Sequence, residues 1–242
     1  MKNTNFFKFE NMDDDFPFYN GRPFSLTITQ SIFILLMITA SIVIFEVAGN
    51  LIPSFIAPFT NIIIPLGAFM LVTKSSWTKL FRKIHLKDIK LIIIVLIINL
   101  IVTVIMGALV SKFAGAGANP VAGFVKNNSL SENIIVYLKM IPMLLGEELI
   151  TIIPFLVILN FSTRFLKCSR KKGVIIAWII SALIFGAIHL PTYNWNIVQA
   201  VLAISTVRLI LTYPYIKTKN IWVSCCVHVL NDWILFLPSL LM

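Results

Sequence analysis

The sequence predicts an all-α fold, a polytopic bundle of about seven transmembrane helices. Of its 242 residues, 58% are hydrophobic and only 12% are charged, a balance far outside that of soluble globular domains. The net charge of +10 could indicate nucleic-acid binding. However, the basic residues occur in short clusters between apolar stretches instead of along one continuous face, so we exclude nucleic acid as a partner and expect a membrane.

Seven apolar stretches are each close to the roughly 20 residues that a helix needs to cross a bilayer. The fifth and sixth are short, and Pro191, Asn194 and Asn196 between them predict a tight turn or a re-entrant break. The chain divides into a tail (1–27), an N-terminal group of helices with a basic loop (28–130) and a C-terminal helical core (131–242). The stretches are 28–47, 52–72, 91–110, 134–159, 174–190, 197–213 and 221–241.

Lysines and arginines are concentrated in alternate connections, at 74–90, 164–172 and 217–219, whereas the connections between them carry few charges. The positive-inside rule therefore predicts a multi-pass protein of the cell membrane with its N-terminus in the cytoplasm and its C-terminus outside. The tail has no ordered charged, apolar and small-residue regions, so it is not a cleaved signal peptide. In the first basic loop, Trp77, Leu80, Phe81 and Ile84 share one helical face, which predicts an interfacial amphipathic helix that anchors this orientation.

Polar and ionisable residues interrupt each of the last four spans. A charged side chain at the bilayer centre costs about 2.5 kcal/mol or more, and polar groups in hydrocarbon must find partners. A single such residue often only forms a hydrogen bond between packed helices. Acids, histidines and an arginine on four consecutive spans instead indicate a functional site. These residues are Glu147, Glu148, His189, Arg208, His228, Asn231 and Asp232.

The spacing within each helix favours convergence of these side chains. His228 and Asp232 are four residues apart and share a face, as do Phe185 and His189. Glu147 and Glu148 point about 100° apart around a helix, so they cannot do the same job from the same place. One can face a cleft while the other pairs with a neighbouring helix.

Carboxylate and imidazole groups together support two kinds of chemistry. They are the ordinary ligands of zinc at a hydrolytic site, where a nearby glutamate acts as general base on water. The same groups also build proton relays in transporters. Peptide hydrolysis within the membrane is the first hypothesis, and a proton-coupled transporter subunit is an alternative.

Three short motifs resemble the signatures of the CAAX protease and bacteriocin-processing (CPBP, or Abi) family of intramembrane metalloendopeptidases. GEEL contains Glu147 and Glu148, FGAIH runs from Phe185 to His189, and HVLND runs from His228 to Asp232. The family pattern is Glu-Glu-x-x-x-Arg, then Phe-x-x-x-His, then His-x-x-x-Asn or Asp, on successive helices. The resemblance covers roughly 131–242.

The resemblance implies a metalloprotease that cleaves peptide or membrane-protein substrates, with a divalent metal, zinc in the first instance, as cofactor. Its catalytic residues would be Glu147, Glu148, His189, His228 and Asp232. The metal ligands would be Glu147, His189 and His228. To these we add Arg208, Phe185 and Asn231 as supporting residues. Because the chain is small, low in charge and rich in Ile and Asn, a bacterial membrane is expected, with peptide processing or bacteriocin self-immunity as the role.

The chain departs from the family pattern at Ile152, where the family has an arginine four residues after the second glutamate. We hypothesise that Arg208, on another span, supplies this charge to Glu148. The alternative is a degenerate site in a non-catalytic immunity or scaffold protein. Counting at about 1.5 Å per residue also places His189 and His228 at different depths, so they converge only if the fifth span starts early, tilts or breaks near Pro191.

Overall fold

The computed structural model describes residues 5–48, 51, 53 and 55–241, and this part of the chain is helical without strands. Seven helical segments are long and apolar enough to cross a membrane, which confirms the predicted fold class. The elements are α1 (Ile28–Ala48), α2 (Ala57–Thr73), η1 (Lys74–Leu80), α3 (Leu86–Phe113), α4 (Pro120–Asn127), α5 (Leu130–Arg164), α6 (Arg170–Ile188), η2 (Val198–Ile204), α7 (Ser205–Thr218) and α8 (Ile221–Leu241).

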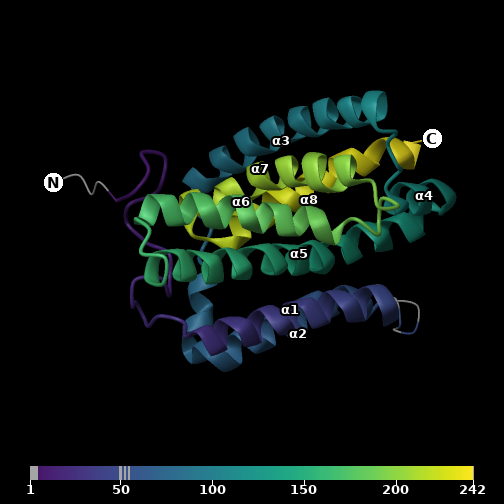
Figure 1. Cartoon of the computed structure of the whole chain (residues 1–242). Coiled ribbons are helices and arrows are strands. Elements are labelled where there is room, and N and C mark those ends of the chain that lie inside the picture. Colours follow the sequence, from purple (N-terminus) through teal and green to yellow (C-terminus); the bar gives the residue numbers. More distant parts are fainter. Residues whose placement is uncertain (1–4, 49–50, 52, 54, 242) are drawn as a thin grey trace.

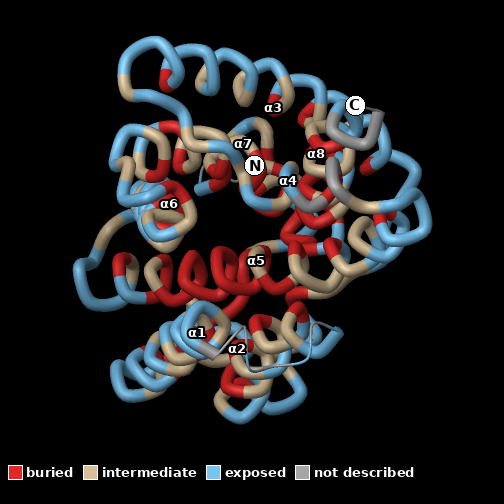
Figure 2. The backbone as a smooth tube through the Cα atoms, turned by 90° about the vertical axis from the view of Figure 1, so that its right-hand side faces the viewer, coloured by how far each residue is buried: buried red, intermediate tan, exposed pale blue. Residues whose placement is uncertain are grey.

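Helix α5 is the central element of the bundle. The α1–α2 pair packs on one side of it, and α6 and α8 pack on the other (Figures 1 and 2). Helix α3 forms an outer layer on α7 and α8. In the apolar 18-residue window of each span, 67% of the α5 residues but only 17% of the α3 residues are buried. Helix α5 is therefore enclosed by protein, whereas most of α3 is left to face lipid.

The local sequence explains why α5 begins and packs as it does. Ser129 caps the helix and forms a capping box with Glu132, which satisfies backbone donors at the first turn. Gly146 lets α2 approach closely, because a Cβ at this position would lie 2.9 Å from Cβ of Asn61. This close contact holds α5 against α2 at the residue immediately before Glu147 and Glu148.

The prediction of an amphipathic helix in the first basic loop is wrong. A short 3₁₀ helix, η1, ends at Leu80, and the chain then runs without helical structure to His85. The reason is a tertiary contact: the Asn220 side chain accepts a hydrogen bond from the Arg82 backbone and donates to the backbone carbonyls of Arg82 and Lys83. Asn220 thereby holds the chain in an extended form that local periodicity does not reveal.

The predicted break between the fifth and sixth spans is present. Helix α6 ends at Ile188, turns occupy residues 189–195, and a π-helical segment, η2, follows. Segment η2 is tied to the preceding α3–α4 connection, since the Gln199 amide donates to the carbonyl of Gly117 and accepts from its N–H, both at 2.8 Å. The loop before α4 and the break after α6 therefore form one hydrogen-bonded unit.

The N-terminal tail is docked onto the helical core through buried ion pairs. Glu10 receives two hydrogen bonds from Arg170, at 2.7 and 2.8 Å, and lies 2.9 Å from Nζ of Lys219. Asp15 also pairs with Arg170, at 2.9 Å. These contacts connect the tail to the start of α6 and to the α7–α8 link, which the sequence alone did not predict.

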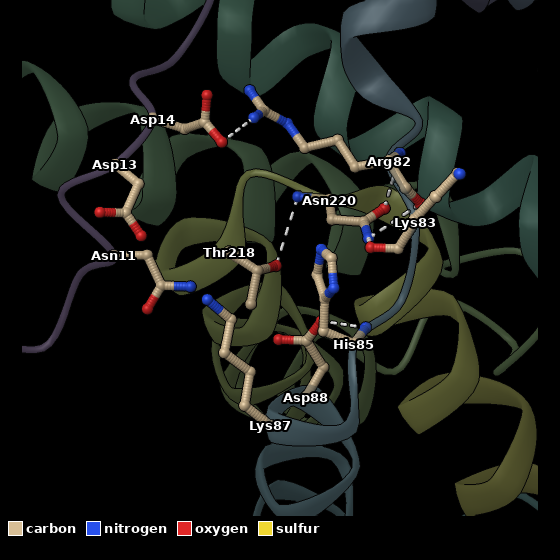
Figure 3. A pocket seen from close by; sticks show the side chains of 10 residues that line it. All are labelled: Asn11, Asp13, Asp14, Arg82, Lys83, His85, Lys87, Asp88, Thr218 and Asn220. Atoms are coloured by element: carbon tan, nitrogen blue, oxygen red, sulfur yellow. Dashed lines mark hydrogen bonds and ion pairs between the residues drawn. The ribbon is translucent and has the colours of Figure 1, made fainter.

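A polar pocket lies beside this tail at the same end of the bundle (Figure 3). Asp14 forms an ion pair with Arg82, and Asn220 bridges from Thr218 to the backbone of Arg82 (Figure 3). Charges of both signs line the pocket. The tail, the η1–α3 link and the α7–α8 link thus meet here and fix one another.

The tail contacts make the stability of the protein pH-dependent. Burial raises the pKa of Glu10, but hydrogen bonds from Arg170 and Lys219 outweigh burial and hold that pKa below its usual range. A lowered folded-state pKa contributes stability that is present above the unfolded value, about 4.3, and is lost as the pH falls through the folded value. Between pH ~5 and ~3 we expect the Tm of wild type to fall more than that of Glu10→Gln; equal falls would contradict this role.

Candidate functional site

Four helices supply the polar residues that the sequence singled out. Glu147 and Glu148 lie on α5, His189 follows the end of α6, and Arg208 lies on α7. Helix α8 supplies His228, Asn231 and Asp232. The structure brings most of these side chains into a single buried cluster.

Glu148, Arg208 and His228 form the centre of this cluster. Nη1 of Arg208 lies 2.7 Å from Oε1 of Glu148, and both side chains are completely buried. Nδ1 of His228 lies 2.9 Å from the same oxygen. The interhelical Glu148–Arg208 ion pair that we hypothesised from the sequence is therefore present. It compensates two charges that would otherwise be unpaired within the membrane.

The hydrogen bonds of both histidines leave Nε2 as the available nitrogen. Nδ1 of His189 lies 2.7 Å from the Phe185 carbonyl oxygen, which can only accept, so Nδ1 carries the proton. Nδ1 of His228 contacts Glu148 at 2.9 Å and Arg208 at 3.4 Å. We assign a proton to Nδ1 of His228 because the contact to the carboxylate is the shorter one. In a neutral ring, Nε2 then carries the lone pair.

Glu147 differs from Glu148 in exposure and in partners. Its side chain is 21% exposed, and its Oε2 lies 3.7 Å from Nε2 of His228, beyond direct hydrogen-bond distance. His189 and Asp232 are also among its electrostatic neighbours. The two adjacent glutamates thus occupy different environments: Glu148 is sealed in an ion pair, whereas Glu147 remains accessible.

Phe185 brings the two histidines to the same region despite their different positions along the helices. Its ring centroid lies 4.5 Å from that of His189 and 6.4 Å from that of His228. The Arg208 guanidinium carbon lies 4.7 Å from the same ring. The sequence predicted that the two histidines converge only if the fifth span starts early, tilts or breaks near Pro191. Helix α6 does start early, at Arg170 instead of residue 174, and it does break after Ile188.

One further polar residue reaches the cluster from outside the three motifs. Nδ2 of Asn231 donates to Oδ1 of Asp232 at 3.0 Å, and Oδ1 of Asn231 accepts from Nδ2 of Asn99 at 2.9 Å. Asn99 lies on α3 and was missed in the sequence. The available signal was a single amide within the apolar run IIIVLIINLIV, which is costly in a membrane unless it is paired.

The donor groups of this cluster fit a divalent metal in kind. A carboxylate and two imidazoles, from Glu147, His189 and His228, are a ligand set that zinc accepts. A backbone carbonyl and the Glu148 carboxylate orient the two imidazoles, as outer-shell partners of metal ligands do. Within the described part of the chain, no three His, Cys, Asp or Glu side chains form a group that could hold a metal ion as they stand.

A protein-family model matches the C-terminal part of the chain. Residues 131–234 match the family model described as Rce1-like, type II CAAX prenyl endopeptidase. Searches of curated proteins and of solved structures found no match. The matched segment runs from the start of α5 into α8 and includes all three motifs, whereas Asn99 lies outside it.

Proposed function

Residues 131–234 form a domain of the Rce1-like type II CAAX prenyl endopeptidase family, and on this premise we propose that the chain is an intramembrane endopeptidase. The observation that carries the proposal is the meeting of the three motifs: His228 of the last motif lies 2.9 Å from Glu148 and 3.7 Å from Glu147 of the first, and Phe185 of the second contacts His228.

Glu147 acts as the general base in this proposal. Its carboxylate removes a proton from a water molecule, and the water oxygen attacks the carbonyl carbon of the scissile peptide bond. As the C–N bond breaks, Glu147 returns the proton to the leaving nitrogen. The products are a new carboxyl terminus and a new amine. Glu147 suits this role because it is the accessible member of the acidic pair.

The other residues hold the reactants in place. Nε2 of His189 accepts a hydrogen bond from the attacking water. His228, when it is protonated on both ring nitrogens, donates from Nε2 to the developing oxyanion, and the neighbouring Asp232 carboxylate balances its positive charge. Glu148 and Arg208 orient His228 through Nδ1. If a divalent metal is present, Glu147, His189 and His228 would hold it as ligands, in place of the proton-transfer and hydrogen-bonding roles given above. Such an ion lowers the pKa of a bound water to about 7 and polarises the carbonyl group.

The substrate in this proposal is a peptide or a membrane-protein segment that enters the bundle from the bilayer. Peptide processing or bacteriocin self-immunity is the biological role that we propose. The basic links at 74–90, 164–172 and 217–219 would lie in the cytoplasm together with the tail, according to the positive-inside rule. The buried contacts of the tail with two of these links support their placement on one side.

Cleavage in H₂¹⁸O tests this function directly. The purified chain in lipid nanodiscs is incubated with a prenylated peptide ending in a CAAX sequence, and in parallel with the same peptide without the prenyl group. We expect cleavage and incorporation of ¹⁸O into the new carboxylate, because water is the nucleophile. A correctly folded wild type that cleaves neither these peptides nor a membrane-peptide library would overturn the proposal.

Metal content tests the cofactor separately. Elemental analysis is expected to find near-stoichiometric zinc in wild type and a loss of metal in His189→Ala and His228→Ala, because two of three ligands are imidazoles. Chelation is expected to stop cleavage and added Zn²⁺ to restore it. Asn133→Ala, which removes a buried amide on the same helix as Glu147, serves as the control and is expected to keep the metal.

A further inference from the structure

Asn99 is an exception on a helix that otherwise faces lipid. Only 17% of the residues in the apolar 18-residue window of α3 are buried, yet Asn99, in the middle of the helix, is completely buried. A buried amide in a membrane helix usually forms a hydrogen bond to a neighbouring helix, and since Oδ1 of Asn99 has no hydrogen-bond partner within the described chain, its Nδ2 is the atom that does so. The only hydrogen bond that Asn99 makes within the described chain goes to Asn231 on α8, at 2.9 Å.

The direction of this hydrogen-bond chain is set by the carboxylate at its end. Oδ1 of Asp232 accepts the hydrogen bond from Nδ2 of Asn231 at 3.0 Å, which fixes the orientation of the Asn231 amide. Oδ1 of Asn231 then faces α3, where it needs a donor. Nδ2 of Asn99 is that donor. The three side chains therefore form a polarised relay from the lipid-facing layer to the site.

We propose that Asn99 is a positioning residue for Asp232, acting through Asn231, so that α3 contributes to the active site although it lies outside the family domain. This inference rests on the proposed function. By holding Asn231 in one amide orientation, Asn99 keeps a donor directed at Oδ1 of Asp232. A carboxylate with one oxygen bound in this way has less freedom to rotate away from His228, one helical turn before it.

A purely structural role for Asn99 makes a different prediction. If the Asn99–Asn231 contact only holds α3 against α8, its loss lowers stability without selective loss of turnover. If it positions Asp232, its loss lowers kcat even in the fraction that remains folded. Outer-shell partners of metal ligands typically contribute about 10-fold to 100-fold in activity, and we expect an effect of this size from Asn99.

The test compares three variants of the full chain in nanodiscs with the prenylated CAAX peptide as the probe. Asn99→Leu is expected to lower kcat by about 10-fold to 100-fold with KM changed by less than about twofold. Asn99→Gln, which keeps an amide donor, is expected to recover part of this loss. Thr103→Val removes a polar atom one turn further along α3 and serves as the control. Equal kcat values for Asn99→Leu and Thr103→Val would overturn the inference.

A second measurement needs neither a substrate nor an active wild type. The Tm values of Asn99→Leu, Asp232→Leu and the double variant are compared with wild type. A relay predicts that the double variant loses clearly less than the two single shifts combined, because the second substitution removes a partner that the first has already released. Additive shifts would overturn the relay. If wild type cleaves no peptide but the shifts are non-additive, the proposed function fails and the relay stands.

Discussion

Replacing Glu147 by glutamine is expected to lower kcat for peptide hydrolysis by about 10²–10⁴-fold, the usual contribution of a general base. Glutamine keeps the size of the side chain but cannot take a proton from water. Among the described residues, Glu147 has no buried ion-pair partner at hydrogen-bond distance, so its replacement leaves few structural interactions to lose. The rate is measured with the prenylated peptide, and the Tm is measured on the same preparation.

Glu148→Gln is the matched control for this experiment, because it changes the neighbouring carboxylate in the same way. It leaves buried Arg208 without a counter-charge and is expected to lower the Tm, whereas Glu147→Gln is expected to leave the Tm nearly unchanged. An unchanged kcat in Glu147→Gln would refute the assignment of the base. A large fall in Tm in that variant would show that Glu147 is a structural residue.

Arg208→Met is expected to destabilise the protein by about 3–5 kcal/mol, the typical cost of removing one member of a buried ion pair. Glu148 would keep its charge inside the bundle with no cation at 2.7 Å. His228 would also lose the neighbour that fixes the shared carboxylate. The free energy of unfolding in mild detergent, measured with a denaturant series, gives the size of the effect.

The double variant Glu148→Met/Arg208→Met separates stability from activity. Replacing both charges by apolar side chains of similar volume removes the desolvation cost of both, so stability is expected to return toward wild type. Activity is not expected to return, since Nδ1 of His228 has lost its acceptor. If the Arg208→Met variant were as stable as wild type, the ion pair would not stabilise the protein as proposed.

The sequence predicted the number of spans and the residues that converge. Both predictions depend on strong energetic constraints: apolar length sets the spans, and an intramembrane charge must find a partner. The second constraint gave the Glu148–Arg208 pair from two residues 60 positions apart, because Ile152 leaves Glu148 without its usual partner on the same helix. The catalytic roles of Glu147, His189, His228 and Asp232 stay predictions.

The features that sequence reasoning missed depend on contacts between distant segments. The helix expected around Phe81 is replaced by extended chain because Asn220 captures the backbone there, and no periodicity in 75–86 encodes that. Helix α4 (Pro120–Asn127) was also missed because it is short, although Asn119 followed by Pro120 is a recognisable helix start signal. Asn99 could be identified only once α3 was placed beside α8.

The docked tail has a consequence for how the protein is made. Asn11 and Lys219 are hydrogen-bonded partners 208 positions apart, and synthesis proceeds at roughly 5–20 residues per second. On the order of 10–40 s therefore pass between the emergence of the tail and that of the lysine it binds. Throughout that interval Glu10 lacks Arg170, Lys219 or both. A chain that stops before Arg170 lacks both cations that bind Glu10 and keeps an undocked acidic and aromatic tail, a mark by which quality-control proteases distinguish unfinished chains from finished ones.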